Sequence, residues 1–115
     1  MLVVTIARSD AGIRSIEASG HAGYAARGRD IVCAGASAVL LTALIGLEQV
    51  AGARVYMRRN DRTGRLKLAL PQGLSGQAAR DAATILATAA AGLRAIGREH
   101  PRNMRVITRK WRKQP

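Results

Sequence analysis

Residues 30–50, DIVCAGASAVLLTALIGLEQV, contain the longest uncharged run of the chain, from Ile31 to Leu47. Asp30 is a good helix N-cap and the apolar run follows it directly, so this stretch predicts a long helix that ends near Gly52. Because the run is apolar nearly all round, we expect a central, buried helix. It falls short of the roughly 20 apolar residues that span a bilayer, so we expect no membrane segment.

The segments around this helix predict the rest of the fold. Short β-branched or alternating apolar segments predict strands at residues 2–8, 13–19, 54–58, 65–70 and 104–108. Ser75 can cap a second helix that runs to about Arg98. The order β-β-α-β-β-α(-β) predicts an α+β fold, a single sheet of mostly antiparallel strands with two long helices packed on it. We expect one domain over residues 1–108 and a basic, flexible tail over residues 109–115.

Charge and cysteine content limit the possible binding partners, cellular compartment and cofactors. The 115 residues carry a formal net charge of +12, which favours binding to anions such as RNA or the ribosome. The single cysteine excludes an internal disulfide and fits a reducing compartment, so we expect a cytoplasmic protein. One cysteine and two histidines do not make a zinc site, and we expect neither a metal nor another cofactor.

The same helix start holds a candidate for nucleophilic chemistry. Cys33, the only cysteine, falls in the first turn of the helix, where unpaired N–H groups and the partial positive charge stabilise a thiolate. His21 ends the second strand, and the glycine-containing loop between them can bring the imidazole to the sulfur. Ser37 follows one helical turn after Cys33, and N–H groups of the helix start could bind an oxyanion.

Each of these residues also has a purely structural interpretation. A free cysteine often only packs in a core, and Ser37 can relieve crowding in a tight helix. His21 can be an exposed residue of a turn. Asp30 can be no more than a helix cap, although it could also orient His21. The spacing alone leaves these alternatives open.

Residues 20–25, GHAGYA, residues 28–34, GRDIVCA, and Ser37 form a long and specific pattern. It resembles the signature of the bacterial ribosomal-processing cysteine proteases, the Prp family. The resemblance implies that Cys33 is the nucleophile, that His21 is the general base and acid, and that Asp30 and Ser37 support the site. It also implies a homodimer, and a substrate that is the N-terminal extension of a large-subunit ribosomal protein, the one numbered twenty-seven.

Two further interpretations concern the loop and the charge. The glycines Gly20, Gly23 and Gly28 make the loop over residues 20–30 a candidate lid. A basic rim could hold the enzyme near ribosomal RNA, although on sequence alone we favour an ordinary solvated surface. The rim consists of Arg58, Arg59, Arg62, Arg65, Lys67, Arg109, Lys110, Arg112 and Lys113. The alternatives to a protease are a non-catalytic ribosome- or RNA-associated binding module and a redox-sensing thiol.

Overall fold

The chain folds into five strands and two helices in the predicted order. The structure, a computed structural model, describes residues 1–26 and 29–112. The elements are β1 (Leu2–Ser9), β2 (Gly12–Ser19), α1 (Ile31–Gln49), β3 (Tyr56–Asn60), β4 (Arg65–Ala69), α2 (Gly76–Glu99) and β5 (Met104–Lys110). The predicted α+β class, with one sheet and two long helices, is confirmed.

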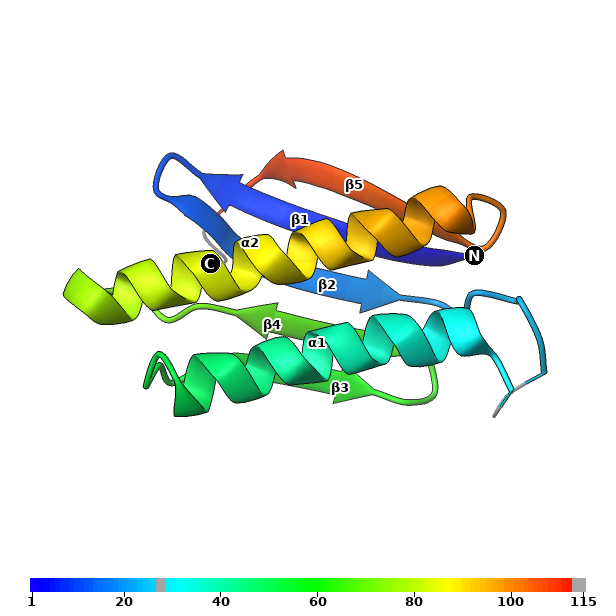
Figure 1. The fold of residues 1–115 in the computed structure, drawn as a ribbon, viewed down its shortest axis with the longest axis horizontal. Coiled ribbons are helices and arrows are strands. Elements are labelled where there is room, and N and C mark those ends of the chain that lie inside the picture. Colours follow the sequence, from blue (N-terminus) through cyan, green and yellow to red (C-terminus); the bar gives the residue numbers. More distant parts are fainter. Residues whose placement is uncertain (27–28, 113–115) are drawn as a thin grey trace.

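The five strands form one sheet in the order β3-β4-β2-β1-β5. Neighbours pair antiparallel except β1 and β5, which run parallel. Both helices lie side by side over the same face of the sheet, and among residues 1–26 and 29–112 no helix covers the opposite face (Figure 1). The fold therefore has two layers, and its core lies between the helices and one face of the sheet.

The core follows from the two periodicities of the sequence. On β1, Leu2, Val4 and Ile6 alternate with more exposed residues and face the helices. Each helix contributes a stripe at helical spacing. The stripes consist of Val32, Ala36, Leu40, Ala43 and Leu47 on α1, and of Ala82, Leu86, Ala89, Ala90 and Leu93 on α2.

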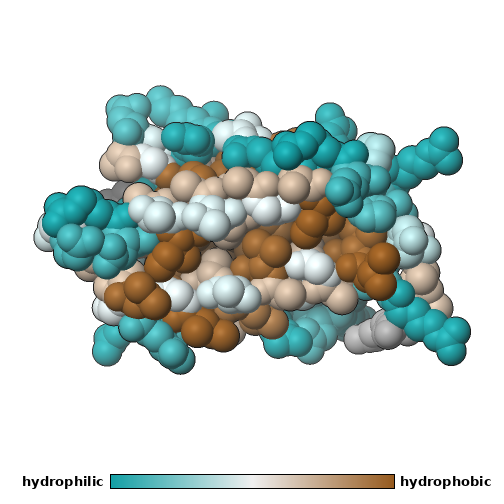
Figure 2. Space-filling model, viewed as in Figure 1, coloured by the Kyte–Doolittle hydropathy of each residue, from teal (hydrophilic) through white to brown (hydrophobic). Residues whose placement is uncertain are grey.

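The outer face of α1 corrects one expectation. The prediction that this helix is buried all round is wrong, because the fold has no third layer to cover it. Ile31 is 60% exposed and Ile45 is 54% exposed. Figure 2 shows apolar residues gathered on this face, with hydrophilic residues at the margins. By length and composition α1 could cross a membrane, but the apolar core helix of a globular protein has the same properties.

Strands β3 and β5 differ from their predicted bounds by two residues, and one predicted helix cap makes no hydrogen bond. Strand β3 starts at Tyr56 rather than at residue 54. Ser75 occupies the N-cap position of α2, but its side chain makes no capping hydrogen bond. Strand β5 continues to Lys110 because it pairs along β1 as far as Arg8, so Arg109 and Lys110 lie in the sheet and not in the expected tail. Residues 113–115 of that tail, with Lys113 of the basic rim, lie outside the described residues.

Candidate active site

The end of β2 delivers His21 to one end of the sheet. Gly20 has a φ of +90°, and a Cβ there would lie 2.6 Å from the backbone oxygen of Met1, so the turn requires glycine. The Gly20 N–H donates to the Thr63 carbonyl oxygen at 3.2 Å. The turn between β3 and β4 therefore holds the segment that carries His21.

The start of α1 positions Cys33. The carboxylate of Asp30 accepts from the N–H groups of Val32 and Cys33, both at 3.0 Å on Oδ1. The prediction that Asp30 is the N-cap is confirmed. Asp30 thus fixes the first helical turn and, with it, the backbone of Cys33.

The second carboxylate oxygen of Asp30 organises the loop before the helix. Oδ2 accepts from the Tyr24 N–H at 3.1 Å. Burial on its own raises the pKa of Asp30, but the backbone N–H groups that donate to the carboxylate, that of Cys33 foremost, outweigh burial and hold the pKa below its ordinary value of 3.8. The carboxylate is therefore charged at neutral pH and engaged with backbone from both the loop and the helix.

The Cys33 sulfur is half-buried and faces the loop. Its Sγ accepts from the Ala22 N–H at 3.1 Å. Among the hydrogen bonds of residues 1–26 and 29–112, none joins the His21 ring to the sulfur. The ring and the sulfur instead line the same two cavities, which places base and nucleophile at one site without a direct bond between them.

The two cavities lie on either side of this pair. One, of about 360 Å³, is bordered by the loop residues Gly23 and Ala25. The other, of about 280 Å³, extends toward the β3–β4 turn. His21, Cys33 and the exposed Ser37 line both. A cleft with the pair at its middle suits an extended peptide. The residues before the scissile bond would then occupy one cavity and the residues after it the other.

Three of the N–H groups that we expected to be available to an oxyanion at the helix start are engaged by Asp30. Those of Val32 and Cys33 donate to the Asp30 side chain, and that of Ala34 donates to the Asp30 carbonyl oxygen at 3.0 Å. The N–H that donates to the sulfur belongs to Ala22. It comes from the loop and not from the helix.

Residues far along the chain tie this loop down, and no local sequence pattern points to them. Asn103 Nδ2 donates to the Ala22 carbonyl oxygen at 3.2 Å, across 81 positions of sequence. The rings of Tyr24 and His100 meet edge to face with centroids 5.4 Å apart. Both contacts come from the segment between α2 and β5. This segment therefore holds in place the part of the loop that faces the sulfur.

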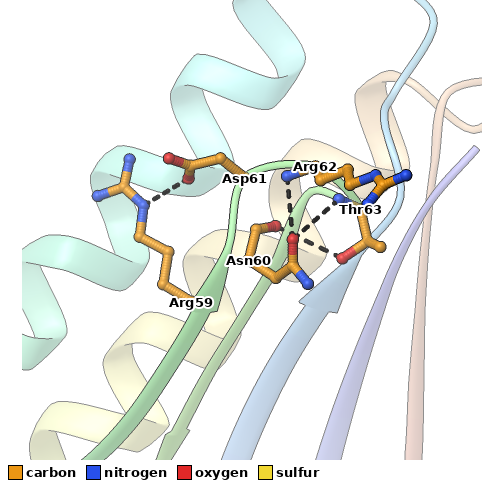
Figure 3. Close-up of polar contacts among 5 residues, drawn as sticks. All are labelled: Arg59, Asn60, Asp61, Arg62 and Thr63. Atoms are coloured by element: carbon orange, nitrogen blue, oxygen red, sulfur yellow. Dashed lines mark hydrogen bonds and ion pairs between the residues drawn. The ribbon is translucent and has the colours of Figure 1, made fainter.

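The tip of the β3–β4 hairpin forms the far wall of the smaller cavity. Arg59 Nε and Asp61 Oδ1 form an exposed ion pair at 2.7 Å, and Figure 3 shows these side chains pointing toward each other. Asn60 Oδ1 accepts from the Arg62 N–H at 3.0 Å and shapes the turn. The hairpin places charged side chains beside the cleft, where a peptide would meet them.

Two further expectations concern the lid and a metal. Gly28, one of the three glycines of the candidate lid, lies outside the described residues, whereas Gly23 has a φ of +68° and open space around it. Within residues 1–26 and 29–112, no cluster of His, Cys, Asp or Glu side chains is arranged to hold a metal ion.

Comparison with known proteins decides the family. The sequence model described as "Cysteine protease Prp" matches residues 1–105. The chain belongs to the Prp family of cysteine proteases. It is 34% identical over 109 residues to the ribosomal processing cysteine protease Prp of Bacillus subtilis (strain 168). The aligned region covers 94% of this chain and 97% of the relative. The expectation drawn from the resemblance is confirmed, and this chain is a cysteine protease.

Solved Prp structures share the fold. The chain is similar to the S. aureus ribosomal processing protease Prp with a covalently linked product peptide, with a TM-score of 0.85, 28% identity and coverage of 95% of this chain and 100% of that chain. The S. aureus protein with a substrate peptide gives a TM-score of 0.80 at 27% identity, with the same coverage of both chains. A Streptococcus mutans protein, with a TM-score of 0.84 at 22% identity over 96% of both chains, matches in fold.

Gly64 provides a test of how this Prp protease holds His21. A Cβ at Gly64 would overlap the Gly20 carbonyl oxygen and lie 2.9 Å from His21 Cε1. We expect Gly64→Ala to displace the histidine and lower kcat/KM for peptide cleavage by about 10²-fold. Gly52→Ala is the matched control, because Gly52 has the same φ of +66° with nothing within 4 Å of a Cβ. The control carries only the backbone cost, about 1 kcal/mol of stability. Equal kcat/KM in the two variants would contradict this role of Gly64.

The cap of α1 predicts a pH-dependent loss of stability. The folded pKa of Asp30 lies below its ordinary value, so its stabilisation is present above 3.8 and is lost as the pH falls through the folded value. At neutral pH we expect Asp30→Ala to cost about 1 kcal/mol, or about 4 °C in Tm.

The measurement is Tm by circular dichroism between about pH 7 and about pH 3. The difference between wild type and Asp30→Ala is expected to shrink as the solution becomes acidic. Ser75→Ala is the control, because Ser75 makes no side-chain capping bond, and its effect is expected to be small at every pH. A difference for Asp30→Ala that is constant over this range would contradict the assignment.

Proposed function

We propose that this protein is an endopeptidase that removes the N-terminal extension of a large-subunit ribosomal protein, the one numbered twenty-seven, with a dyad of Cys33 and His21. The observation that carries the proposal is the cleft with both side chains at its middle in a member of the Prp family. The names of the relatives support the substrate, since they are ribosomal processing proteases and two of the structures hold peptides.

The dyad accounts for the first half of the reaction. His21 takes the thiol proton, and Cys33 Sγ attacks the carbonyl carbon of the scissile bond. The protonated imidazole then gives its proton to the amine of the departing fragment. A thioester to the N-terminal fragment remains on the sulfur.

Water completes the cycle. His21 takes a proton from water, hydroxide adds to the thioester carbonyl, and the sulfur leaves with the proton returned. The Ala22 N–H donates to Sγ at 3.1 Å and loses this acceptor when the sulfur bonds to the carbonyl carbon, so we assign it to the developing oxyanion in both halves. Asp30 and Ser37 have supporting roles: Asp30 fixes the first turn of α1, and Ser37 offers a hydroxyl in the cleft.

Access, assembly and location complete the proposal. The candidate lid is the loop with Gly20, Gly23 and Gly28. Its opening for a peptide requires that the contacts of Asn103 with Ala22 and of His100 with Tyr24 break. The protein acts in the cytoplasm as a homodimer. The exposed apolar face of α1, on which this chain does not cover Leu41 and Ile45, supports the dimer. The basic surface keeps the enzyme near ribosomal RNA, where its substrate assembles.

Peptide cleavage tests the proposed substrate. The protein is incubated with a synthetic peptide that spans the junction between extension and mature start of the ribosomal protein from the same organism, and the products are weighed by mass spectrometry. We expect a single cut at the junction and no cut in a peptide of scrambled sequence. Cuts scattered equally over both peptides, or an intact junction peptide, would contradict the proposed substrate.

A further inference from the structure

The face of the sheet opposite the helices gathers side chains that the protease chemistry does not use. Both helices lie over one face (Figure 1). The pairing register sets Tyr56, Ala69, Ser15, Ala7 and Arg109 opposite one another in a row that crosses all five strands. Strand residues that are opposite in register point to the same face. This row faces away from α1 and α2, since its neighbours along the strands, such as Ile6 and Leu68, are in the core.

The face without helices, here called the open face, is strongly basic. It is open at its margins, because Ala7, Ser15 and Ala69 in the middle of the first row are buried. Register places two further rows beside the first, and among the strand residues that the structure describes on this face, Glu17 is the single carboxylate. Arg65 pairs with it at 3.2 Å. The cations of these rows are Arg58, Arg65, Lys67, Arg105 and Arg109. After that one ion pair the face retains an excess of positive charge, which is the electrostatic footprint of a polyanion site.

A cavity of about 350 Å³ lies on this face, between β4 and the residues at the end of β5. Ala7 and Ser15 form part of its lining, and Ser15 is the one polar side chain among the described residues that is fully buried, with 4% exposure. Basic side chains and one indole complete the lining. They are Lys67, Arg109, Lys110, Trp111 and Arg112. Small residues, an aromatic ring and several cations in one cavity suit a base together with its phosphate.

Trp111 is held in place at this cavity. Its backbone N–H donates to the Arg8 carbonyl oxygen at 2.6 Å, which extends the pairing of β1 with β5. The Arg14 guanidinium lies 6.0 Å from the centroid of the indole ring, and it donates to the carbonyl oxygen of Pro71 at 3.1 Å. The ring is thus ordered before any ligand arrives, which lowers the entropic cost of stacking on it.

The chain places two of its three aromatic side chains here. It has one tryptophan, two tyrosines and no phenylalanine. Tyr56, 54% exposed, lies on the edge strand β3. Trp111 follows β5, but its ring lies near Arg14 of β2 and lines a cavity with Lys67 of β4. Tyr56 is exposed and Trp111 is half-buried. Aromatic side chains among cations on a sheet surface are typical of proteins that stack the bases of single strands.

We propose that the open face of the sheet binds single-stranded RNA, with phosphates on Lys67, Arg109 and their basic neighbours and with a base stacked on Trp111. A second copy of this chain fits poorly, because two faces of the same charge repel. The proteolytic cleft lies on the helix side of the sheet, lined by Cys33 and the core-side residues Leu40 and Leu66. RNA and peptide can therefore bind together, and the proposal stands whether or not the proposed ribosomal substrate is correct.

The only tryptophan makes the test direct. A single-stranded RNA of about 12 nucleotides and mixed sequence is titrated into the full-length protein while Trp111 fluorescence is followed. We expect quenching whose apparent affinity falls steeply between about 50 mM and about 200 mM salt. By anisotropy of labelled RNA, we expect Trp111→Ala to weaken binding about 5- to 100-fold.

Charge-reversal variants distinguish RNA binding by this face from general attraction by the net charge of the protein. We expect Lys67→Glu with Arg109→Glu to weaken binding at least about tenfold and to lower the slope of log affinity against log salt by about 0.7 for each phosphate that the variant no longer neutralises. The control is Arg80→Glu with Arg98→Glu on the exposed side of α2, which makes the same change in net charge. We expect cleavage of a model peptide to be unchanged in both double variants.

Three results would overturn the proposal. The first is unchanged fluorescence at the lower salt concentration. The second is an equal loss of RNA affinity in the two double variants, which would show attraction by net charge alone. The third is dissociation of a dimer by Trp111→Ala, seen by sedimentation velocity, with RNA binding intact, which would assign the face to a second copy.

Discussion

Replacing Cys33 by alanine is expected to abolish peptide cleavage, with kcat/KM lowered by about 10³-fold or more. Cys33 is the only cysteine of a chain that belongs to a cysteine protease family, so no other thiol can form the thioester. A loss this large has a chemical cause: without the sulfur, water must attack the amide directly, and the split into two easier steps is lost.

The control for Cys33→Ala is a measurement that the variant still folds. Cys33 is half-buried and its Sγ accepts a hydrogen bond from Ala22, so alanine leaves α1 intact and removes one tie to the loop. We expect an unchanged circular dichroism spectrum and a Tm within a few degrees of wild type. Cleavage at the wild-type rate by the folded Cys33→Ala protein would show that the reaction does not pass through this residue.

Replacing His21 by alanine is expected to lower kcat by about 10²- to 10⁴-fold, the usual contribution of a positioned general base and acid. Because His21 is exposed and lines both cavities, its removal opens space that a small base can enter. Imidazole added to the buffer is therefore expected to restore part of the activity of His21→Ala and none of the activity of Cys33→Ala.

The other histidine provides the matched control. His100 contacts the ring of Tyr24 and does not line either cavity, so His100→Ala is expected to lower activity only a few-fold, without rescue by imidazole. If His100→Ala lost as much activity as His21→Ala, or if imidazole rescued both equally, His21 would not be the base of the reaction.

Local chemistry explains which parts of the fold can be predicted from sequence. The start of α1 is predictable because a cap is a contact between neighbours: Asp30 meets N–H groups two and three residues ahead. The prediction that α1 is buried all round is wrong, since apolar residues at Ile31 and Ile45 do not tell how many layers the fold has. The predicted end of β5 is misplaced because only the long-range pairing with β1 defines it.

The same distinction applies to the site. His21 and Cys33 are both candidates from one short segment, and the structure brings them to a common cleft. Asn103 and Gly64 escape prediction, because each acts on that segment from a distant part of the chain. Gly64 is recognisable as a turn glycine, but its closeness to His21 depends on how the hairpin packs against the end of β2, which no local pattern encodes.

The most direct test of catalysis by Cys33 is the covalent intermediate. Protein and junction peptide are mixed, quenched in acid at early times and weighed intact, and the adduct is located by fragmentation. We expect a mass gain equal to the N-terminal product less one water, on the peptide that contains Cys33. An adduct on any other residue, with cleavage intact, would contradict the assignment of Cys33 as the nucleophile.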